Sequence, residues 1–260
     1  MSIIEVQNLK KTYDRDEAVK GISFSVEQGE IFGLLGPNGA GKTTTLEILE
    51  GLKEADRGNI KIFDTDLHRD GKKTRENIGI VLQSSGYFDY LTVSELLDLF
   101  LSFYSESFSK EELVEKFDLG KLLPHRFTDL SGGQKQRFIL ATSIMHKPKL
   151  LFLDEPTIGL DPAARQNFWD ILFELREGGM TILITTHYLE EAEILCDRVA
   201  IIDAGRIVAC DRPVKLINSL GLVSRIRFTS SKPVSVAELE NLQGVNIARR
   251  DRYTYDLETD

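Results

Sequence analysis

The chain has 260 residues, enough for one large domain or for one domain with a small appendage. Its composition of 42% hydrophobic and 28% charged residues is ordinary for a soluble globular protein. The formal net charge of −9 argues against a general nucleic-acid binder, because such proteins carry a basic surface, and we therefore expect no nucleic-acid partner.

Neither a membrane-spanning helix nor a disulfide framework is expected. A helix that spans a bilayer needs about 20 apolar residues in a row, and apolar runs such as Leu150–Leu153 are ended by charged residues. Residues 1–11 lack the charge, apolar block and cleavage site of a signal peptide. Cys196 and Cys210 lie in apolar stretches, so we expect core residues in a reducing compartment. These features predict a cytosolic protein that only another chain could hold at a membrane.

The first part of the chain alternates apolar and polar residues as strands do. The expected strands are Ile3–Val6, Ile22–Val26 and Glu30–Leu35. The third strand runs directly into a glycine-rich loop at 36–43, and a helix is expected at Thr44–Leu49. A short pair of strands is then expected at Asn59–Phe63 and Ile78–Leu82.

A helical insert is expected over about residues 84–147. Thr92 with Glu95, and Ser109 with Glu112, have the spacing of capping boxes, in which each side chain bonds the other residue's backbone N–H. Apolar residues then recur on one helical face over Val93–Tyr104. The insert therefore contains at least two predicted helix starts.

Alternating strands and helices return after the insert. The expected elements are strands Lys149–Asp154 and Met180–Thr185, helices at Ala163–Arg176 and from Tyr188, and a hairpin of Val199–Asp203 with Arg206–Ala209. This alternation predicts a parallel sheet covered by helices on both faces. After Gly221 the pattern changes to short alternating runs such as Ser224–Thr229. We therefore expect a main domain at 1–220 and a small β-rich appendage at 221–260.

The loop at 36–43 reads GPNGAGKT and matches the P-loop pattern GxxxxGK[ST] between a strand and a helix. Its glycines let backbone N–H groups turn toward phosphate oxygens, and the following helix points its positive end at the same anion. The pattern predicts a nucleoside triphosphate site in which Lys42 reaches the β- and γ-phosphates and Thr43 binds Mg²⁺. The expected ATP contacts are Gly36, Pro37, Asn38, Gly39, Ala40, Gly41, Lys42, Thr43 and Thr44.

A carboxylate for this magnesium ion is expected at Asp154. The preceding residues Leu150–Leu153 are apolar, so Asp154 ends a buried strand at the carboxyl edge of the sheet, where ligands of open α/β folds bind. Glu155 supplies a second carboxylate beside it. A second acid at this place predicts a general base that acts on the attacking water.

Residues 130–134 read LSGGQ, which belongs to no kinase or GTPase pattern. Ser131 and Gln134 have the spacing of a capping box, so the motif could be a plain helix start. A plain cap does not need the two adjacent glycines, however, and these lower the stability of the helix. With the P-loop and the LLFLDE run at 150–155, residues 1–220 resemble the ATP-binding subunit of an ABC transporter. The run at 185–211 is most similar to the ATPases of ABC-2 type exporters.

The resemblance implies an α/β fold: a RecA-like P-loop NTPase with a mostly parallel sheet, an N-terminal antiparallel β-subdomain, the helical insert and the small C-terminal β-rich appendage. It also implies roles for single residues. Tyr13 would stack on adenine, and His187 would sense the γ-phosphate. The implied metal ligands are Thr43, Gln83 and Asp154, and the implied catalytic residues are Lys42, Glu155 and His187. Contacts to ATP from the opposite subunit would come from Ser131, Gly132, Gly133, Gln134 and Asp161.

The resemblance further implies partners. Two ATPase subunits, as a homodimer or a paired heterodimer, would close over two ATP molecules, and hydrolysis would part them. A separately encoded permease would dock on the helical insert and hold the chain at the cytoplasmic face of the membrane. Tyr87, Phe88 and Tyr90 either line this dock or pack within the insert. Two other functions stay open, an ATPase of an ABC importer and a non-transport ATPase such as one for iron–sulfur assembly.

Overall fold

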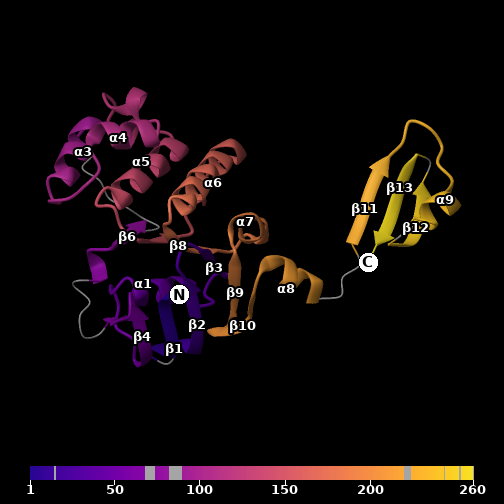
Figure 1. Ribbon diagram of the computed structural model, residues 1–260, viewed down its shortest axis with the longest axis horizontal. Coiled ribbons are helices and arrows are strands. Elements are labelled where there is room, and N and C mark those ends of the chain that lie inside the picture. The colour runs from indigo at the N-terminus through magenta and orange to yellow at the C-terminus, as the bar shows by residue number, and fades with distance from the viewer. Residues whose placement is uncertain are drawn as a thin grey trace. The chain divides into compact units, whose positions relative to one another are not determined.

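The computed structural model describes residues 1–14, 16–67, 74–81, 90–219, 224–242, 244–251 and 253–259. The chain forms two compact units, Met1–Pro213 and Val214–Asp260. The boundary thus falls after Pro213, whereas the sequence pattern placed it at 220. Figure 1 labels the elements that are described below.

An antiparallel sheet of four strands begins the first unit, in the order β2-β1-β4-β5. Its strands are β1 (Ser2–Tyr13), β2 (Asp16–Glu27), β4 (Arg57–Ile62) and β5 (Thr65–Asp66). The first two strands are longer than expected because they pair along their whole length, as far as Tyr13 with Asp16. Backbone hydrogen bonds hold their polar ends in the sheet, and such ends give no burial pattern in the sequence.

The second sheet has six strands in the order β10-β9-β3-β8-β7-β6. Its strands are β3 (Ile31–Leu35), β6 (Ile78–Val81), β7 (Leu150–Asp154), β8 (Thr181–Thr186), β9 (Arg198–Asp203) and β10 (Arg206–Asp211). All neighbouring pairs are parallel except the hairpin of β9 and β10. The mostly parallel core is therefore confirmed. The expected pairing of Asn59–Phe63 with Ile78–Leu82 is wrong, because β4 and β6 belong to different sheets.

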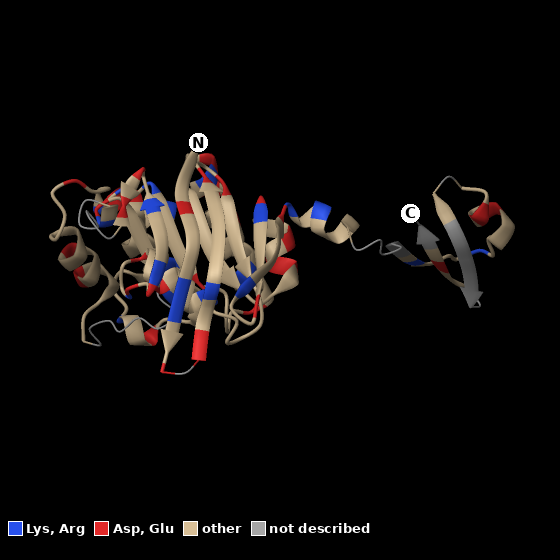
Figure 2. Cartoon of the chain, turned by 90° about the horizontal axis from the view of Figure 1, so that it is seen from below, with Lys and Arg blue, Asp and Glu red and all other residues tan. Residues whose placement is uncertain are grey.

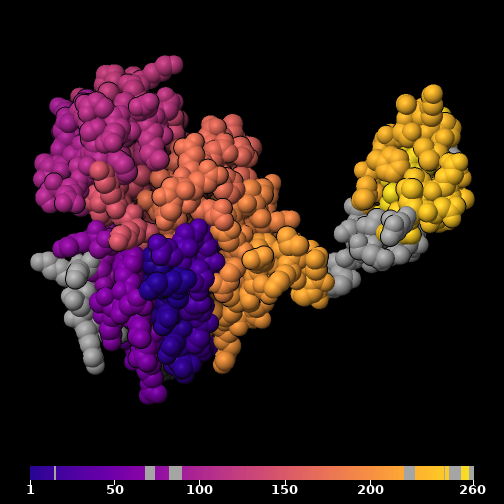
Figure 3. Space-filling model, viewed as in Figure 1, coloured from indigo at the N-terminus to yellow at the C-terminus, as the bar shows by residue number. Residues whose placement is uncertain are grey.

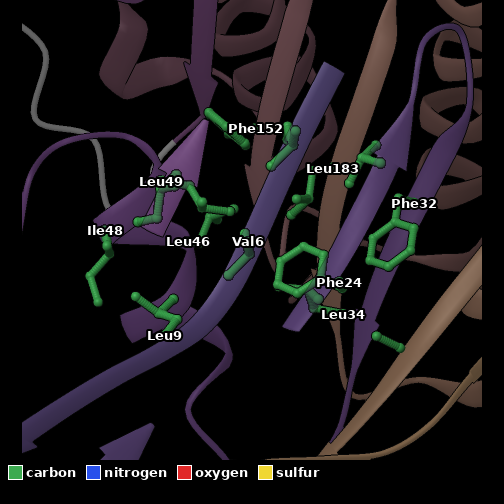
Figure 4. Close-up of a cluster of buried hydrophobic side chains, with 14 of the residues drawn as sticks. Val6, Leu9, Phe24, Phe32, Leu34, Leu46, Ile48, Leu49, Phe152 and Leu183 are labelled. Atoms are coloured by element: carbon green, nitrogen blue, oxygen red, sulfur yellow. The ribbon is translucent and has the colours of Figure 1, made fainter. Parts of the chain in front are cut away.

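Helix α1 (Lys42–Leu49) and both sheets share one hydrophobic core. Figure 4 shows Leu46 and Leu49 of this helix in the same cluster as Val6 of β1 and Phe152 of β7. Each fully buried side chain of this size contributes about 1.5–3 kcal/mol. The core therefore anchors the chain on both sides of the glycine-rich loop, through β3 before it and α1 after it.

The helical insert contains α3 (Val93–Leu101), α4 (Lys110–Lys116) and α5 (Gly132–Ile144), with short 3₁₀ turns at Gly120–Leu122 and Phe127–Asp129. The capping boxes of Thr92 with Glu95 and of Ser109 with Glu112 are confirmed. In the space-filling view the insert's residues form a lobe of their own on the first unit (Figure 3). Tyr90, just before α3, is 85% exposed and so does not pack within the insert. Tyr87 and Phe88 lie outside the described residues.

The structure describes two further helices of the first unit, α6 (Pro162–Glu177) and α7 (Leu189–Leu195). Pro162 occupies the first turn of α6, where its missing N–H costs nothing, and Asp161 caps the helix. Phe168, Trp169, Leu172 and Leu175 form the buried face of α6. Helix α6 follows β7, and α7 follows β8. The N-terminal ends of both helices therefore lie near the carboxyl edge of the parallel sheet, where the glycine-rich loop also begins.

The second unit contains a three-stranded antiparallel sheet in the order β11-β13-β12. Its elements are β11 (Ser224–Thr229), α9 (Val236–Glu240), β12 (Val245–Asp251) and β13 (Thr254–Thr259). Leu239 of α9 packs with Tyr255 and Leu257 of β13, and the Tyr255 hydroxyl accepts a hydrogen bond from the Val234 N–H at 2.7 Å. Helix α8 (Pro213–Ser219) joins the units in the sequence. The sequence patterns predicted the β-rich character but neither α8 nor α9.

Several expectations from the composition can be compared with the structure. Cys196 is buried, as expected, but Cys210 is exposed, because it lies on the edge strand β10 with alternating exposure. Among the helices that the structure describes, none is long and apolar enough to cross a membrane. Basic and acidic residues are interspersed over the strands visible in Figure 2.

Candidate functional site

The glycine-rich loop connects β3 to α1 at the carboxyl edge of the parallel sheet. Gly36 donates its N–H to the Thr186 carbonyl at 3.3 Å, which joins the start of the loop to the end of β8. A Cβ at Gly36 would lie 2.1 Å from the Ile202 carbonyl oxygen, and one at Gly41 would lie 2.5 Å from the Ala18 carbonyl oxygen. Gly41 also has φ of +102°, which favours glycine. Packing and backbone conformation together therefore fix this loop.

Lys42 is the first residue of α1, and its side chain is only 3% exposed. Its Nζ donates to the carbonyl oxygens of Gly36 at 2.8 Å and Pro37 at 3.1 Å. The same Nζ lies 3.1 Å from Glu155 Oε1. An ammonium group held against the loop in this way can exchange one of these oxygens for a phosphate oxygen.

Asp154 ends β7 beside the start of α1. Its Oδ1 accepts hydrogen bonds from Thr185 Oγ1 at 2.5 Å and from Thr43 Oγ1 at 3.3 Å. Burial raises the pKa of the Asp154 carboxyl above its ordinary value, and these two hydrogen bonds oppose the rise. A threonine hydroxyl beside a carboxylate provides the hard oxygen ligands that Mg²⁺ prefers. Gln83, the third expected metal ligand, lies outside the described residues.

Glu155 has a backbone conformation that is uncommon for a non-glycine residue, with φ of +45°. Its N–H donates to Thr185, to the carbonyl oxygen at 3.2 Å and to Oγ1 at 3.0 Å. Its carboxylate has two partners, Lys42 at Oε1 and His187 Nδ1 at Oε2, the latter at 3.1 Å. The strained backbone thus aims a nearly buried carboxylate between a lysine and a histidine beside the P-loop.

Tyr13, the P-loop and Glu155 border one pocket of about 440 Å³. Tyr13 is 39% exposed, and its ring centre lies 5.6 Å from Lys11 Nζ and 5.3 Å from Lys53 Nζ. The pocket is lined by Tyr13, Ala18, Asn38, Gly39, Gly41, Lys42, Thr43, Thr44, Glu155 and Ile158. It therefore joins the aromatic residue to the phosphate loop in one continuous space.

Ser131 and Asp161 cap the helices α5 and α6. Ser131 donates its N–H to Gln134 Oε1 at 2.8 Å, and its Oγ accepts from the Gln134 N–H at 3.4 Å, so the capping box is formed. Asp161 Oδ1 accepts from the Ala164 N–H at 2.8 Å. Gly133 packs so closely on α6 that its Cβ would lie 2.9 Å from the Ala164 Cβ.

The LSGGQ loop and Asp161 line a second pocket, which is separate from the P-loop. Its lining includes Ser131, Gly133, Gln134, Leu160 and Asp161, and it shares no lining residue with the pocket of Tyr13 and Lys42. The structure thus brings the expected site residues together as two groups. The pocket of the LSGGQ group contains no residue of the phosphate loop of its own chain.

Sequence reasoning missed several polar residues that support these groups. Thr185 is fully buried at the end of β8 and bonds both Asp154 and the backbone of Glu155. Thr157 and Glu191 are each 1% exposed and bond one another. A threonine pair that ends an apolar strand was a usable signal for Thr185. The contact of Thr157 with Glu191 joins two elements distant in the sequence and had no local signal.

Comparison with known proteins identifies relatives of the chain. A family model described as ABC transporter matches residues 19–158. The linearmycin resistance ATP-binding protein LnrL of Bacillus subtilis (strain 168) is 39% identical over 234 residues, which cover 88% of this chain and 75% of that protein. The Nod factor export ATP-binding protein I of Burkholderia orbicola (strain AU 1054) is 42% identical over 221 residues, which cover 83% of this chain and 73% of that protein. A solved dimeric ATP-binding cassette in a post-hydrolysis state, bound to ADP and Pi, superposes with a TM-score of 0.72 and 27% identity, covering 81% of this chain and 98% of that one.

Proposed function

The chain belongs to the ABC transporter family and is an ATP-binding ATPase of that family, and from this premise we propose that it acts as a dimer to power export through a separate permease. The observation that carries the proposal is the cluster of Lys42, Glu155 and His187 beside the phosphate loop. This cluster provides a cation for the phosphates, a carboxylate for the water and a polar partner for that carboxylate.

The site suits ATP with a magnesium ion. Thr43 and Asp154 would hold Mg²⁺, which would supply positive charge to neutralise the charge that develops on the phosphates. Tyr13 would stack on the adenine, and the N–H groups of the P-loop would bind the phosphates. Binding of ATP would draw Lys42 toward the γ-phosphate and free one oxygen of Glu155.

Glu155 would then act as the general base. Its Oε2 is held by His187 Nδ1 at 3.1 Å, which leaves Oε1 to accept the proton of the attacking water. His187 is 28% exposed, and its other ring nitrogen would contact a γ-phosphate oxygen of bound ATP. The exchange of partners at Lys42 would couple the arrival of ATP to the release of the base.

A second copy of the chain would complete the site. The LSGGQ loop and Asp161 border a pocket that contains none of the phosphate-loop residues. Ser131 and the helix start behind it can therefore receive the γ-phosphate of ATP held by a partner. The solved cassette with ADP and Pi is itself dimeric, which supports this assembly.

Export through a separate permease is supported by the names of the relatives, one for linearmycin resistance and one for Nod factor export. No helix in the described part of the chain could itself cross the bilayer. We propose that the chain acts at the cytoplasmic face of the membrane, where exposed residues of the helical insert such as Tyr90 would be available to the permease. The chain should copurify with a multispanning protein from detergent-solubilised membranes, and recovery of the ATPase alone would count against this partner.

Substitution of the base tests the ATPase mechanism. Glu155→Gln should bind ATP and form a stable dimer but release phosphate at least about 100-fold more slowly, because general-base catalysis contributes roughly 10²–10⁴-fold. Glu193→Gln on α7 is the matched control, since Glu193 is exposed. Phosphate release and size-exclusion chromatography with ATP report the two effects. Hydrolysis by Glu155→Gln at the wild-type rate would show that Glu155 is not the base.

Substitution of the cap serine tests the composite site. Ser131→Ala should leave ATP affinity of the monomer unchanged, because Ser131 lies outside the pocket of Lys42. Hydrolysis by the dimer should fall. A matched loss of ATP affinity in calorimetry would instead place Ser131 in the site of its own chain.

A further inference from the structure

One oxygen of a buried glutamate joins three elements of the ATPase unit. Glu191 on α7 is 1% exposed. Its Oε1 accepts a hydrogen bond from Thr157 Oγ1 at 2.8 Å and another from Trp169 Nε1 at 3.1 Å. Thr157 and Trp169 are themselves 1% and 4% exposed, so water does not compete for these bonds.

The three residues connect the two groups of the candidate site. Thr157 lies in the segment between Glu155 and Asp161, and Trp169 lies on the helix that Asp161 caps. Glu191 lies in the first turn of α7, the helix that begins just after His187. The hydrogen bonds of Glu191 therefore tie the helix that follows His187 to the segment that leads from Glu155 to Asp161.

A second contact runs beside the first. The guanidinium of Arg165 on α6 lies 5.1 Å from the ring centre of Tyr188, the residue after His187. The rings of His187 and Tyr188 are 4.1 Å apart. Because α6 also packs on Gly133 of the LSGGQ loop, these contacts form a continuous connection from His187 to the second pocket.

Stability does not account for a carboxylate at this position. Glu191 Oε2 is buried and has no hydrogen-bond partner among the residues that the structure describes. An unpaired buried polar atom costs about 1–3 kcal/mol, a cost that an apolar side chain at this place would not have. The contribution of Glu191 is therefore the geometry that its paired oxygen imposes.

We propose that Glu191 is a positioning residue that makes His187 and the Asp161 segment move as one body. ATP bound at one site would then determine the position of the Asp161 segment at the other site. This inference rests on the proposed dimer. In each protomer of that dimer, His187 contacts the ATP of its own phosphate loop, and Asp161 and Ser131 contact the ATP of the partner. The hydrogen bonds of Glu191 add a buried connection between these two groups to the direct bond of His187 with Glu155.

The main test removes one donor, the Thr157 hydroxyl, with little change in the shape of the buried region. Thr157→Val is nearly isosteric, and Glu191→Gln keeps an oxygen that can accept both bonds. Thr157→Val should lower kcat about tenfold, because small misplacements of catalytic groups cost rates of this order. Glu191→Gln should lower kcat less than Thr157→Val does, and Glu191→Leu should lower kcat more. The affinity of the monomer for ATP should stay within about twofold, since none of these residues lines the pocket of Lys42.

Asp170→Asn is the matched control, because Asp170 is on α6, is exposed and pairs with Gln166 rather than with α7. It should leave kcat and ATP affinity at wild-type values. Melting temperatures of all variants separate a loss of folded protein from a loss of rate. A kcat of Thr157→Val equal to wild type would overturn the proposal, as would a fall in kcat matched by an equal fall in ATP affinity.

Trp169 provides a direct spectroscopic signal, because it is the chain's sole tryptophan and its indole N–H bonds Glu191. Addition of ATP and Mg²⁺ to wild type should shift its emission, and the shift should be smaller in Thr157→Val. Emission that does not respond to ATP in wild type, while the enzyme hydrolyses ATP, would refute the connection. Absence of ATPase activity in wild type would instead refute the proposed function, so the two failures are distinguishable.

Discussion

Glu50 should make the stability of the ATPase unit depend on pH. It is the C-cap residue of α1, it is 1% exposed, and its Oε1 has no hydrogen-bond partner among the described residues. Burial, together with the smaller effects of the nearby charges of Asp154 and Glu47, raises the pKa of the Glu50 carboxyl from 4.5 to about 8. The perturbation that tests this is Glu50→Gln, which replaces the carboxyl with a neutral group of the same shape.

The sign and size follow from proton linkage. Between its ordinary pKa of 4.5 and about 8, Glu50 holds a proton in the folded state and loses it on unfolding. The folded state therefore binds more protons, and the free energy of unfolding falls as pH rises, by about 1.4 kcal/mol per pH unit. From about pH 5.5 to 7.5 the wild type should lose about 2.5 kcal/mol through this group. Glu50→Gln should not lose this contribution.

Urea denaturation at several pH values, without nucleotide or Mg²⁺, measures the effect. The stability of Glu50→Gln relative to wild type should increase with pH across this window, since any constant effect of the buried amide does not depend on pH. Glu54→Gln is the control, because Glu54 is an exposed glutamate a few residues away. Parallel stability curves for wild type and Glu50→Gln would refute the reasoning.

Three further substitutions test the site. Lys42→Ala should weaken ATP binding more than tenfold, because it removes a cation from the phosphates; unchanged affinity in calorimetry would contradict the P-loop assignment. Gly36→Ala should lower the free energy of unfolding by about 1–3 kcal/mol, because its Cβ would lie 2.1 Å from the Ile202 carbonyl oxygen; a neutral urea midpoint would show that the loop can shift at little cost. Asp161→Ala should cost about 1 kcal/mol through loss of its hydrogen bond to the Ala164 N–H, and a stability equal to wild type would mean that the cap contributes nothing.

Much of the candidate site follows from short patterns in the sequence. The P-loop is a local structure, in which glycines, lysine and threonine act through their own backbone and the next helix. The capping boxes of Thr92 and Ser131 are equally local, and both form. Placing Asp154 beside Thr43 required one further step, that parallel strands bring their carboxyl ends to one edge.

Contacts between elements that are distant in the sequence could not be predicted from those local patterns. The sequence at Asn59–Phe63 and at Ile78–Leu82 predicts strands, but strand propensity does not say which sheet a strand joins. Cys210 lies in an apolar run and is nevertheless exposed, because β10 is an edge strand. The residues that were missed behave in the same way: each has its partners on elements far away in the chain.

The sequence by itself determined the chemistry of this protein: a phosphate loop, a carboxylate pair, an LSGGQ loop and a histidine, each specified by a few neighbouring residues. Tertiary structure decided which of these groups meet. It placed Glu155 between Lys42 and His187, gave the LSGGQ loop a pocket separate from that of the phosphate loop, and buried Glu191 against Thr157 and Trp169. The physical reason is that hydrogen bonds within a turn depend on adjacent residues, whereas contacts between elements depend on the order of strands in the sheet and on the packing of helices over it.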